Sequence, residues 1–211
     1  MCEVSAKRPA KSGKTTPAAG ERPLRADAQR NRDKLIEIAG QAFAEHGIET
    51  SLEDIAARAK VGIGTLYRHF PTREHLVEVV YRHEVEALCQ AAEDLARKHP
   101  PDKALAEWMQ RFVDYIAAKR GMASSLKLLL AGNSEFFAAT SGKIPAAVQG
   151  LVDTAIAQGS IRSDVDSSDV LHALSGIYSL PQTPDWRERS RRLITLLMDG
   201  LRAGAKAGRP S

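Results

Sequence analysis

From Lys60 to Leu76 the chain reads KVGIGTLYRHFPTREHL, a composition that suits neither a buried helix nor a linker. Val61, Leu66 and Phe70 are predicted to face a small core, and Pro71 ends the run. Because helices usually end before a proline, we expect a short helix from about Gly62 to Phe70. Its exposed face would carry Ile63, Gly64, Thr65, Tyr67, Arg68 and His69. Their hydroxyl, phenol, imidazole and guanidinium groups suit hydrogen bonds to phosphates and base edges.

Two other helices are predicted before this segment. The first runs from Asp27 to His46, and Gly47 directly after it is the predicted C-terminal stop. Its apolar residues recur at helical intervals: Leu35, Ile36, Ala39, Ala42 and Phe43. The second is predicted within TSLEDIAARA and ends near Ala59; Thr50, three residues before Glu53, predicts a capping box at its start. Three short helices with a brief turn between the second and third describe a helix-turn-helix, which is a DNA-binding motif.

Helical periodicity continues along the rest of the chain. A fourth helix is predicted from its N-cap, Thr72, to Lys98. Five segments follow: KALAEWMQRFVDYIAAK, MASSLKLLLAG, GKIPAAVQGLVDTAIAQG, SSDVLHALSGIYSL and TPDWRERSRRLITLLMDGLRAG. Asp166 is a predicted cap of the fourth segment; Thr183, Pro184 and Gly204 are the predicted cap, first position and stop of the last. No run alternates as a strand would, so the expected fold is all-α, with about nine helices.

Charge divides the chain into parts. The formal net charge is +4, and residues 1–73 hold 13 Lys and Arg against 9 Asp and Glu, whereas the remainder holds 17 of each. A basic module joined to a neutral one indicates a polyanionic partner for the first. Residues 1–25 have almost no large apolar residues and are expected to be a disordered basic arm. Residues 26–72 form the predicted DNA-binding domain, and residues 73–211 form a second helical domain.

Several other classes of protein are disfavoured. Cys2 and Cys89 are far apart, and the sequence has no CxxC motif or histidine cluster, so we expect neither a disulfide framework nor a metal, and no cofactor. Cys89 is expected to be a buried structural thiol rather than a redox trigger. No apolar run approaches the roughly 20 residues that cross a bilayer, and the N-terminal residues lack the apolar stretch of a secretory signal, so we expect a cytoplasmic protein without membrane contacts.

The stretch from about Arg30 to Glu78, above all EDIAARAKVGIGTLYRHFPTREHL, resembles the DNA-binding domain of the tetracycline-repressor (TetR) family of bacterial regulators. The motif GTLYRHF followed by Pro and a new helix is diagnostic of that family. The resemblance implies an N-terminal helix-turn-helix domain, a C-terminal helical domain that binds a ligand and dimerises, and double-stranded operator DNA as partner. It covers about a quarter of the chain at motif level.

Site residues are carried over position by position. The resemblance implies that Ser51 touches phosphate and that the DNA backbone is contacted by Thr65, Tyr67, His69 and Arg73. Base edges would be faced by Ile63, Gly64 and Tyr67. Weaker candidates for phosphate or minor-groove contacts are Arg25, Arg30 and Arg32.

The sequence departs from the family pattern at the turn. Lys60 occupies a position where glycine is common; a positive φ there would cost a lysine about 1 kcal/mol. Gly62 stands where a capping serine is common and remains a fair N-cap. Ile63 cannot donate a hydrogen bond to a base, so we expect it to contact a thymine methyl group.

The second domain would hold an effector and a dimer interface. An apolar pocket is predicted among Trp108, Phe112, Tyr115, Met122, Leu126, Phe136, Phe137 and Tyr178, although aromatic residues at helical spacing also suit a packed core. The predicted dimer interface comprises Leu171, Leu174, Leu193, Leu196, Leu197 and Leu201, of which several could instead fill the monomer core.

The resemblance therefore predicts a ligand-responsive transcriptional regulator, and specifically a repressor, that binds a palindromic operator as a homodimer and is released by a small, largely apolar effector. The alternatives are a ligand-independent or architectural DNA-binding protein and an all-helical enzyme. The enzyme is disfavoured because the sequence has no HExxH, GxSxG or clustered DxD motif.

Overall fold

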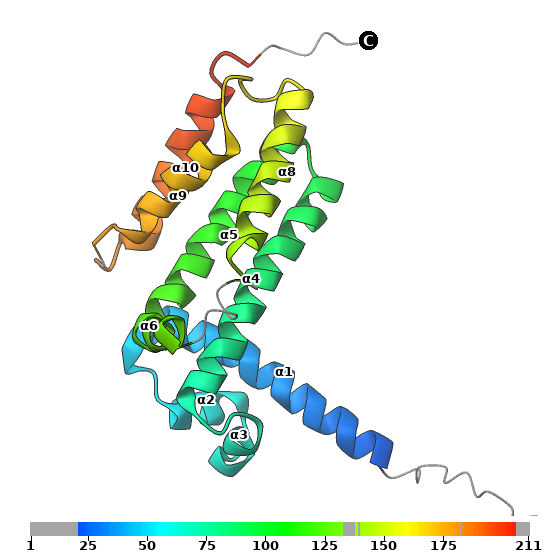
Figure 1. Cartoon of the computed structure of the whole chain (residues 1–211), viewed down its shortest axis with the longest axis vertical. Helices are drawn as coiled ribbons and strands as arrows, with labels where there is room; N and C mark the ends of the chain where they lie inside the picture. The colour runs from blue at the N-terminus through cyan, green and yellow to red at the C-terminus, as the bar shows by residue number, and fades with distance from the viewer. Residues whose placement is uncertain (1–20, 133–137, 139, 182, 206–211) are drawn as a thin grey trace, which may run out of the picture.

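The structure, a computed structural model, describes residues 21–132, 138, 140–181 and 183–205 (Figure 1). These residues contain nine α-helices, one 3-10 helix and no strand, which confirms the all-α prediction. The helices are α1 (Glu21–His46), η1 (Gly47–Glu49), α2 (Leu52–Ala59), α3 (Ile63–His69), α4 (Arg73–Lys98), α5 (Pro101–Gly121), α6 (Ala123–Gly132), α8 (Lys143–Ala157), α9 (Ser167–Tyr178) and α10 (Trp186–Arg202).

The helices form two lobes joined by two long helices. In Figure 1, α2 and α3 lie at one end beside α1, while α4 and α5 extend from there into the second lobe. There α5 packs against α4, α8 and α10, and its C-terminal end packs against α1. Because α1 and α4 both contact the second lobe, the helix-turn-helix is attached to it at two places.

The first helix begins earlier than its apolar periodicity indicates. It starts at Glu21 rather than Asp27, so residues 21–25 of the predicted arm are helical. Pro23 is the third residue of α1, where a missing N–H costs no intrahelical hydrogen bond. Periodicity could not reveal this extension because no apolar repeat runs through it. The end of α1 is as predicted: Gly47 adopts a φ of 64° directly after His46.

The N-terminal lobe has a closed apolar core. Its fully buried side chains come from α1, α2, α3 and α4, and they include Leu35, Phe43, Ile55, Leu66, Phe70 and Leu76. Val61, predicted as core, is half-buried against this cluster. Ala118, Met122 and Leu126, from α5 and α6, complete the cluster, so the two lobes share part of it.

The predicted helix caps are partly confirmed. Thr72 and Asp166 accept hydrogen bonds from the backbone N–H groups of His75 and Ser168, as caps should. The prediction of a capping box at Thr50 is wrong. The residue that caps α2 is Ser51, whose Oγ accepts a hydrogen bond of 3.0 Å from Asp54 N. Thr50 is buried, and its hydroxyl donates instead to carbonyl oxygens at the end of α1 and in η1.

The predicted start of the last helix is also wrong. The helix begins at Trp186, and Thr183 and Pro184 lie in the preceding turn. The Thr183 hydroxyl donates to Asp185 Oδ1 at 2.5 Å, and Trp186 N donates to the Thr183 carbonyl at 3.0 Å. Because Thr183 stabilises this turn, it is not available to cap the helix. Gly204, with a φ of 80°, lies beyond the end of α10, as predicted.

Candidate nucleic-acid interface and neighbouring cavities

The turn between α2 and α3 depends on Lys60. This residue has φ 58° and ψ 40°, in the left-handed region that a lysine adopts at a cost of about 1 kcal/mol. Lys60 N and Val61 N both donate to carbonyl oxygens in the last turn of α2, at 3.0 Å each. Gly62 is the N-cap of α3 and makes no side-chain capping hydrogen bond, so only Lys60, Val61 and Gly62 separate α2 from α3. The positive φ expected from the family pattern is thus present at this lysine.

The exposed face of α3 is a mixture of apolar and polar groups. Ile63 is 37% exposed and Tyr67 is 44% exposed, while Thr65 and His69 are half-buried. Gly64 is exposed, and a Cβ added there would meet nothing within 4 Å. A glycine within a helix costs about 1 kcal/mol relative to alanine. No contact within the described chain accounts for that cost, whereas close approach of a partner to the backbone would.

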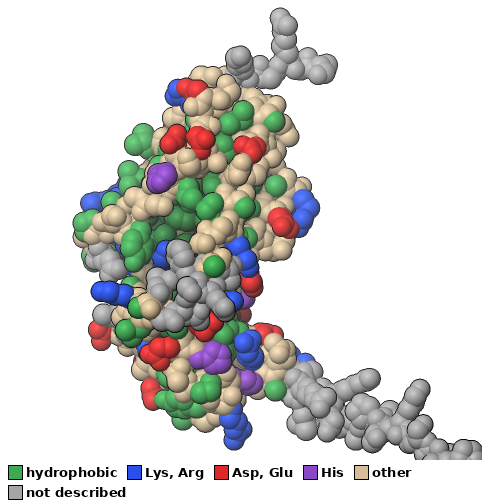
Figure 2. Space-filling view, in the orientation of Figure 1, with side chains coloured by type: hydrophobic (Ala, Val, Ile, Leu, Met, Phe, Trp, Pro, Cys, Tyr) green, Lys and Arg blue, Asp and Glu red, His purple; other side chains and the backbone are tan. Residues whose placement is uncertain are grey.

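Ser51 and two cations flank this face. The Ser51 Oγ accepts from Asp54 N, which leaves its hydroxyl proton free for an external acceptor. Lys60 and Arg68 are both exposed, one before α3 and one within its last turn. Arg68 is exposed, as its place in the sequence predicted, whereas Lys60 was not among the predicted binding residues, although its charge next to the glycine-rich turn was the available signal. The lobe containing α2 and α3 shows Lys, Arg and His side chains among acidic ones (Figure 2).

Arg73 points inward. Its Nη1 donates to the Thr50 carbonyl at 2.6 Å, and its guanidinium lies 5.3 Å from the ring centre of Phe43. It is half-buried, so its first role is to hold the N-terminus of α4 against α1 and the start of α2. The backbone contact that the family resemblance implies for Arg73 stays a prediction.

The basic residues of α1 are also engaged within the chain. Arg30 is exposed and pairs with Asp27. The Arg32 guanidinium lies 5.5 Å from the ring centre of Phe70. The side chain of Arg25 lies outside what the structure describes. The described contacts of Arg30 and Arg32 are with Asp27 and Phe70 rather than with the exposed face of α3, and the DNA contacts of all three arginines stay predictions.

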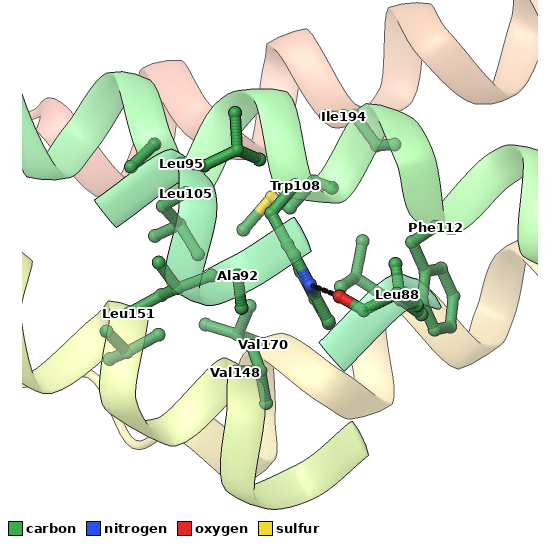
Figure 3. Packing of buried hydrophobic residues seen from close by; sticks show 14 of the residues in the cluster. Leu88, Ala92, Leu95, Leu105, Trp108, Phe112, Val148, Leu151, Val170 and Ile194 are labelled. Atoms are coloured by element: carbon green, nitrogen blue, oxygen red, sulfur yellow. Dashed lines mark hydrogen bonds between the residues drawn. The ribbon is translucent and has the colours of Figure 1, made fainter. Parts of the chain in front are cut away.

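The residues predicted to line an effector pocket are mostly packed core. Trp108, Phe112, Tyr115, Met122 and Leu126 are at least 95% buried. Figure 3 shows Trp108 inside the second lobe, with its Nε1 donating to the Leu88 carbonyl at 2.9 Å. Tyr178 is 40% exposed, and Phe136 and Phe137 lie outside the described residues. Of the six described members, Tyr115 lines one small cavity of about 180 Å³. The hydroxyl groups of Tyr115 and Tyr81 form a hydrogen bond, and burial raises the pKa of Tyr115.

A larger cavity of about 860 Å³ lies where α1, α5 and α10 meet. None of the six described pocket candidates lines it. Its wall is contributed by both lobes and comprises Phe43, Ala44, Glu45, His46, Gly47, Glu49, Ala117, Arg120, Gly121, Ala123, Thr183, Pro184, Trp186 and Arg187. Periodicity could not find this site, because it joins helix ends that are far apart in sequence.

The six leucines of the predicted dimer interface fall into two groups. Leu174 and Leu201 are buried in the core of the second lobe. Leu196 is 69% exposed and Leu193 is 40% exposed, while Leu171 and Leu197 are half-buried. The α9 and α10 residues Ala173, Leu174, Gly176, Ile177, Leu193, Ile194, Leu196 and Leu197 line a groove of about 440 Å³. An open apolar groove bordered by exposed leucines is a feature of interaction surfaces.

Cys89 has the features of a structural thiol. It is half-buried on α4, and burial raises the pKa of its thiol, which disfavours the reactive thiolate.

The described residues contain no group of three or more His, Cys, Asp or Glu that could hold a metal ion. No helix among them is long and apolar enough to cross a membrane.

Comparison with known proteins covers both lobes. The family model "Bacterial regulatory proteins, tetR family" matches residues 35–80, and "Transcriptional regulator SbtR-like, C-terminal domain" matches residues 100–203. A TetR transcriptional regulator from Streptomyces coelicolor is similar in structure, with 44% identity, a TM-score of 0.73 and coverage of 81% of this chain and 98% of that chain. A TetR regulator from Mycobacterium vanbaalenii has 32% identity, a TM-score of 0.67 and coverage of 85% and 99%.

Similarity to a curated relative covers only part of either chain. An HTH-type transcriptional regulator from Staphylococcus aureus strain USA300 is 39% identical over 64 residues, which are 30% of this chain. The match spans 35% of the length of that relative.

Proposed function

Since the chain belongs to the TetR family of bacterial transcriptional regulators and is a DNA-binding protein, we propose that it binds a palindromic operator as a homodimer and represses transcription until a small, largely apolar effector releases it. The observation that carries this proposal is the exposed face of α3. Ile63 and Tyr67 are exposed there, and no described residue packs against the site of a Cβ at Gly64.

That face suits the major groove. Gly64 allows the helix backbone to approach the bases, while Ile63 and Tyr67 reach base edges from either side of it. Ser51, Thr65 and His69 would donate to phosphates, as would the exposed cations Lys60 and Arg68. These contacts make affinity fall as salt concentration rises, because each neutralised phosphate releases counterions.

The apolar α9–α10 surface supports the proposed homodimer. A two-fold axis through this surface would cover Leu193 and Leu196 in both copies, since an isologous interface uses the same patch twice. Two recognition helices would then enter successive major grooves about 34 Å apart. Joint binding raises affinity well above that of one short helix.

Release by an effector requires two packed states. The attachment of the helix-turn-helix through both α1 and α4 means that a shift of the second lobe also reorients α3. The effector must bind the released state more tightly than the DNA-bound one, and DNA and effector then weaken each other's binding reciprocally.

Gel-shift titration of the DNA upstream of the gene, against random duplex of equal length, tests the proposal. We expect specific, salt-dependent binding that Tyr67→Ala weakens by about tenfold or more. Leu128→Ala, at a 66% exposed leucine on α6, is the matched control and should leave affinity unchanged. Binding of the upstream DNA no better than random duplex would overturn the proposed function.

A further inference from the structure

Arg120 is a buried cation with incomplete bonding. It is 7% exposed, and its Nη2 donates to the carbonyl oxygens of Ile177 (3.0 Å), Tyr178 and Leu180 (2.8 Å) at the end of α9. The Trp186 ring covers its guanidinium, with 4.6 Å from Cζ to the ring centre. Its Nη1 is buried without a hydrogen-bond partner among the described residues. A buried unsatisfied donor is costly, and more so on a charged group.

The acidic residues around the cavity do not neutralise Arg120. Glu45 is paired with Arg58 at 2.7 Å, and this arginine holds the pKa of Glu45 below its usual value. Glu49 is exposed. The second arginine of the wall, Arg187, donates to the Ala44 carbonyl at 2.7 Å and lies 3.5 Å from Asp114. Within the described wall, the positive charge of Arg120 therefore has no carboxylate of its own.

The rest of the wall suits an apolar body. Ala44, Ala117, Ala123 and Trp186 contribute aliphatic and aromatic surface. A cavity of about 860 Å³ falls within the size range of small-molecule sites, which combine apolar walls with a few polar groups that orient the ligand. A carboxylate is an acceptor whose charge and planar geometry match a guanidinium.

We propose that this inter-lobe cavity binds an organic carboxylate with an apolar body, which hydrogen-bonds to Arg120, and that its occupation lowers affinity for DNA. The regulatory half of this proposal rests on the proposed function. The cavity becomes the effector site in place of the aromatic residues of the second lobe, which are packed core.

Coupling to DNA arises from the position of the wall. Nη1 has almost no accessible surface in this conformation, so a ligand oxygen that reaches it must displace wall atoms. The wall includes the end of α1 and η1, which lead directly into α2. The end of α5 packs so closely on α1 that a Cβ at Gly121 would lie 2.0 Å from the Phe43 carbonyl oxygen. Such tight packing transmits displacement, and a ligand that prefers the displaced state shifts the population toward it.

Calorimetric titration of the full-length protein with phenylacetate, 4-phenylbutyrate and octanoate, each against its primary amide, tests the site. We expect the carboxylates to bind about tenfold or more tightly than their amides, because the amide lacks the charge. Arg120→Gln should remove that preference. Because Arg120 also holds the end of α9, a second variant is needed: Ala123→Leu fills the cavity and should weaken both classes of probe. Ala157→Leu, at an exposed alanine of α8, is its control.

DNA affinity is measured on the same samples with and without saturating carboxylate. A reduction of about fivefold or more that disappears in Ala123→Leu supports the regulatory half; an unchanged affinity overturns it. Equal binding of acids and amides, no binding by any probe, or full binding by Ala123→Leu overturns the site. If the probes bind in an Arg120-dependent manner but upstream DNA is bound no better than random duplex, the proposed function fails and the site stands.

Discussion

Arg73 Nη1 donates a hydrogen bond of 2.6 Å to the carbonyl oxygen of Thr50, which joins the first residue of α4 to the residue two before α2. The Thr50 hydroxyl in turn donates to the Ala42 carbonyl in α1 at 3.0 Å. This short chain of bonds fixes α1, α2 and α4 relative to one another. We therefore expect α2 and α3 to move together with α4 when α4 is displaced.

Removal of this link should destabilise the N-terminal lobe. Arg73→Ala loses the bond to Thr50 and the contact with Phe43, so we expect its free energy of unfolding to fall by about 1–3 kcal/mol in urea denaturation. Arg68→Ala, at an exposed arginine, should change stability by less than about 0.5 kcal/mol. Undiminished stability of Arg73→Ala together with lost DNA binding would assign Arg73 to phosphate contact instead.

The left-handed conformation of Lys60 gives a second prediction. Glycine adopts a φ of 58° without the steric cost that a Cβ imposes, whereas alanine keeps that cost. Lys60→Gly should therefore be more stable than Lys60→Ala by about 1 kcal/mol in chemical denaturation. Both variants lose the exposed charge, so both should weaken DNA binding and reduce its salt dependence alike. Equal stability of the two variants would show that the turn relaxes to another conformation.

Ile63 is predicted to distinguish thymine from uracil. Its side chain is 37% exposed on α3 and offers only apolar contact, so a thymine methyl group is the base feature it can recognise. Replacement of every thymine in the selected operator by uracil should weaken binding of the parent protein. The Ile63→Ala variant should lose most of that difference, measured by competition gel shift. Equal affinity of the parent for thymine and uracil operators would contradict this interpretation.

Glu84 should make the protein less stable as pH rises. Burial is the largest influence on this residue and raises the pKa of its carboxyl above 4.5, while nearby His83 acts in the opposite direction. A raised folded-state pKa means that the folded protein holds the proton more tightly, so stability falls as pH rises from about 4.5 through the folded pKa. Glu84→Gln should be the more stable protein at neutral pH, and this gain should shrink toward pH 4.5 in thermal melts. A gain independent of pH would refute the assignment.

Local signals in the sequence predicted much of this molecule. The helix-turn-helix core, the ends of α3 and α4, and the caps at Thr72 and Asp166 follow from periodicity, proline positions and short-range hydrogen bonds, all of which act within a few residues. Thr50 shows the limit of such signals. Its hydroxyl bonds to Ala42, eight residues away, and that tertiary contact removes it from the cap position that the local pattern favours.

The cavity that we propose as the effector site could not be predicted from such local signals. Aromatic spacing along α5 indicates which face is buried, but the same spacing serves a packed core and a pocket lining, and here Trp108 and Phe112 are core. The inter-lobe cavity depends on how Arg120 on α5 meets Trp186 at the start of α10, and on the end of α1 closing the same space. The periodicity of a single helix cannot predict that the ends of three helices lie together.

The exposed leucines of α10 give the last prediction. Leu196 is 69% exposed and lines the α9–α10 groove. If the dimer buries this position in both copies, Leu196→Asp would place two charged carboxylates in the interface, and their desolvation would oppose association. We expect this variant to sediment as a monomer with an unchanged helical circular-dichroism spectrum, and to bind operator at least about a hundredfold more weakly because joint binding is lost. Leu128→Asp, at a leucine that is 66% exposed on α6, should remain dimeric. A dimeric Leu196→Asp protein would place the interface on another surface.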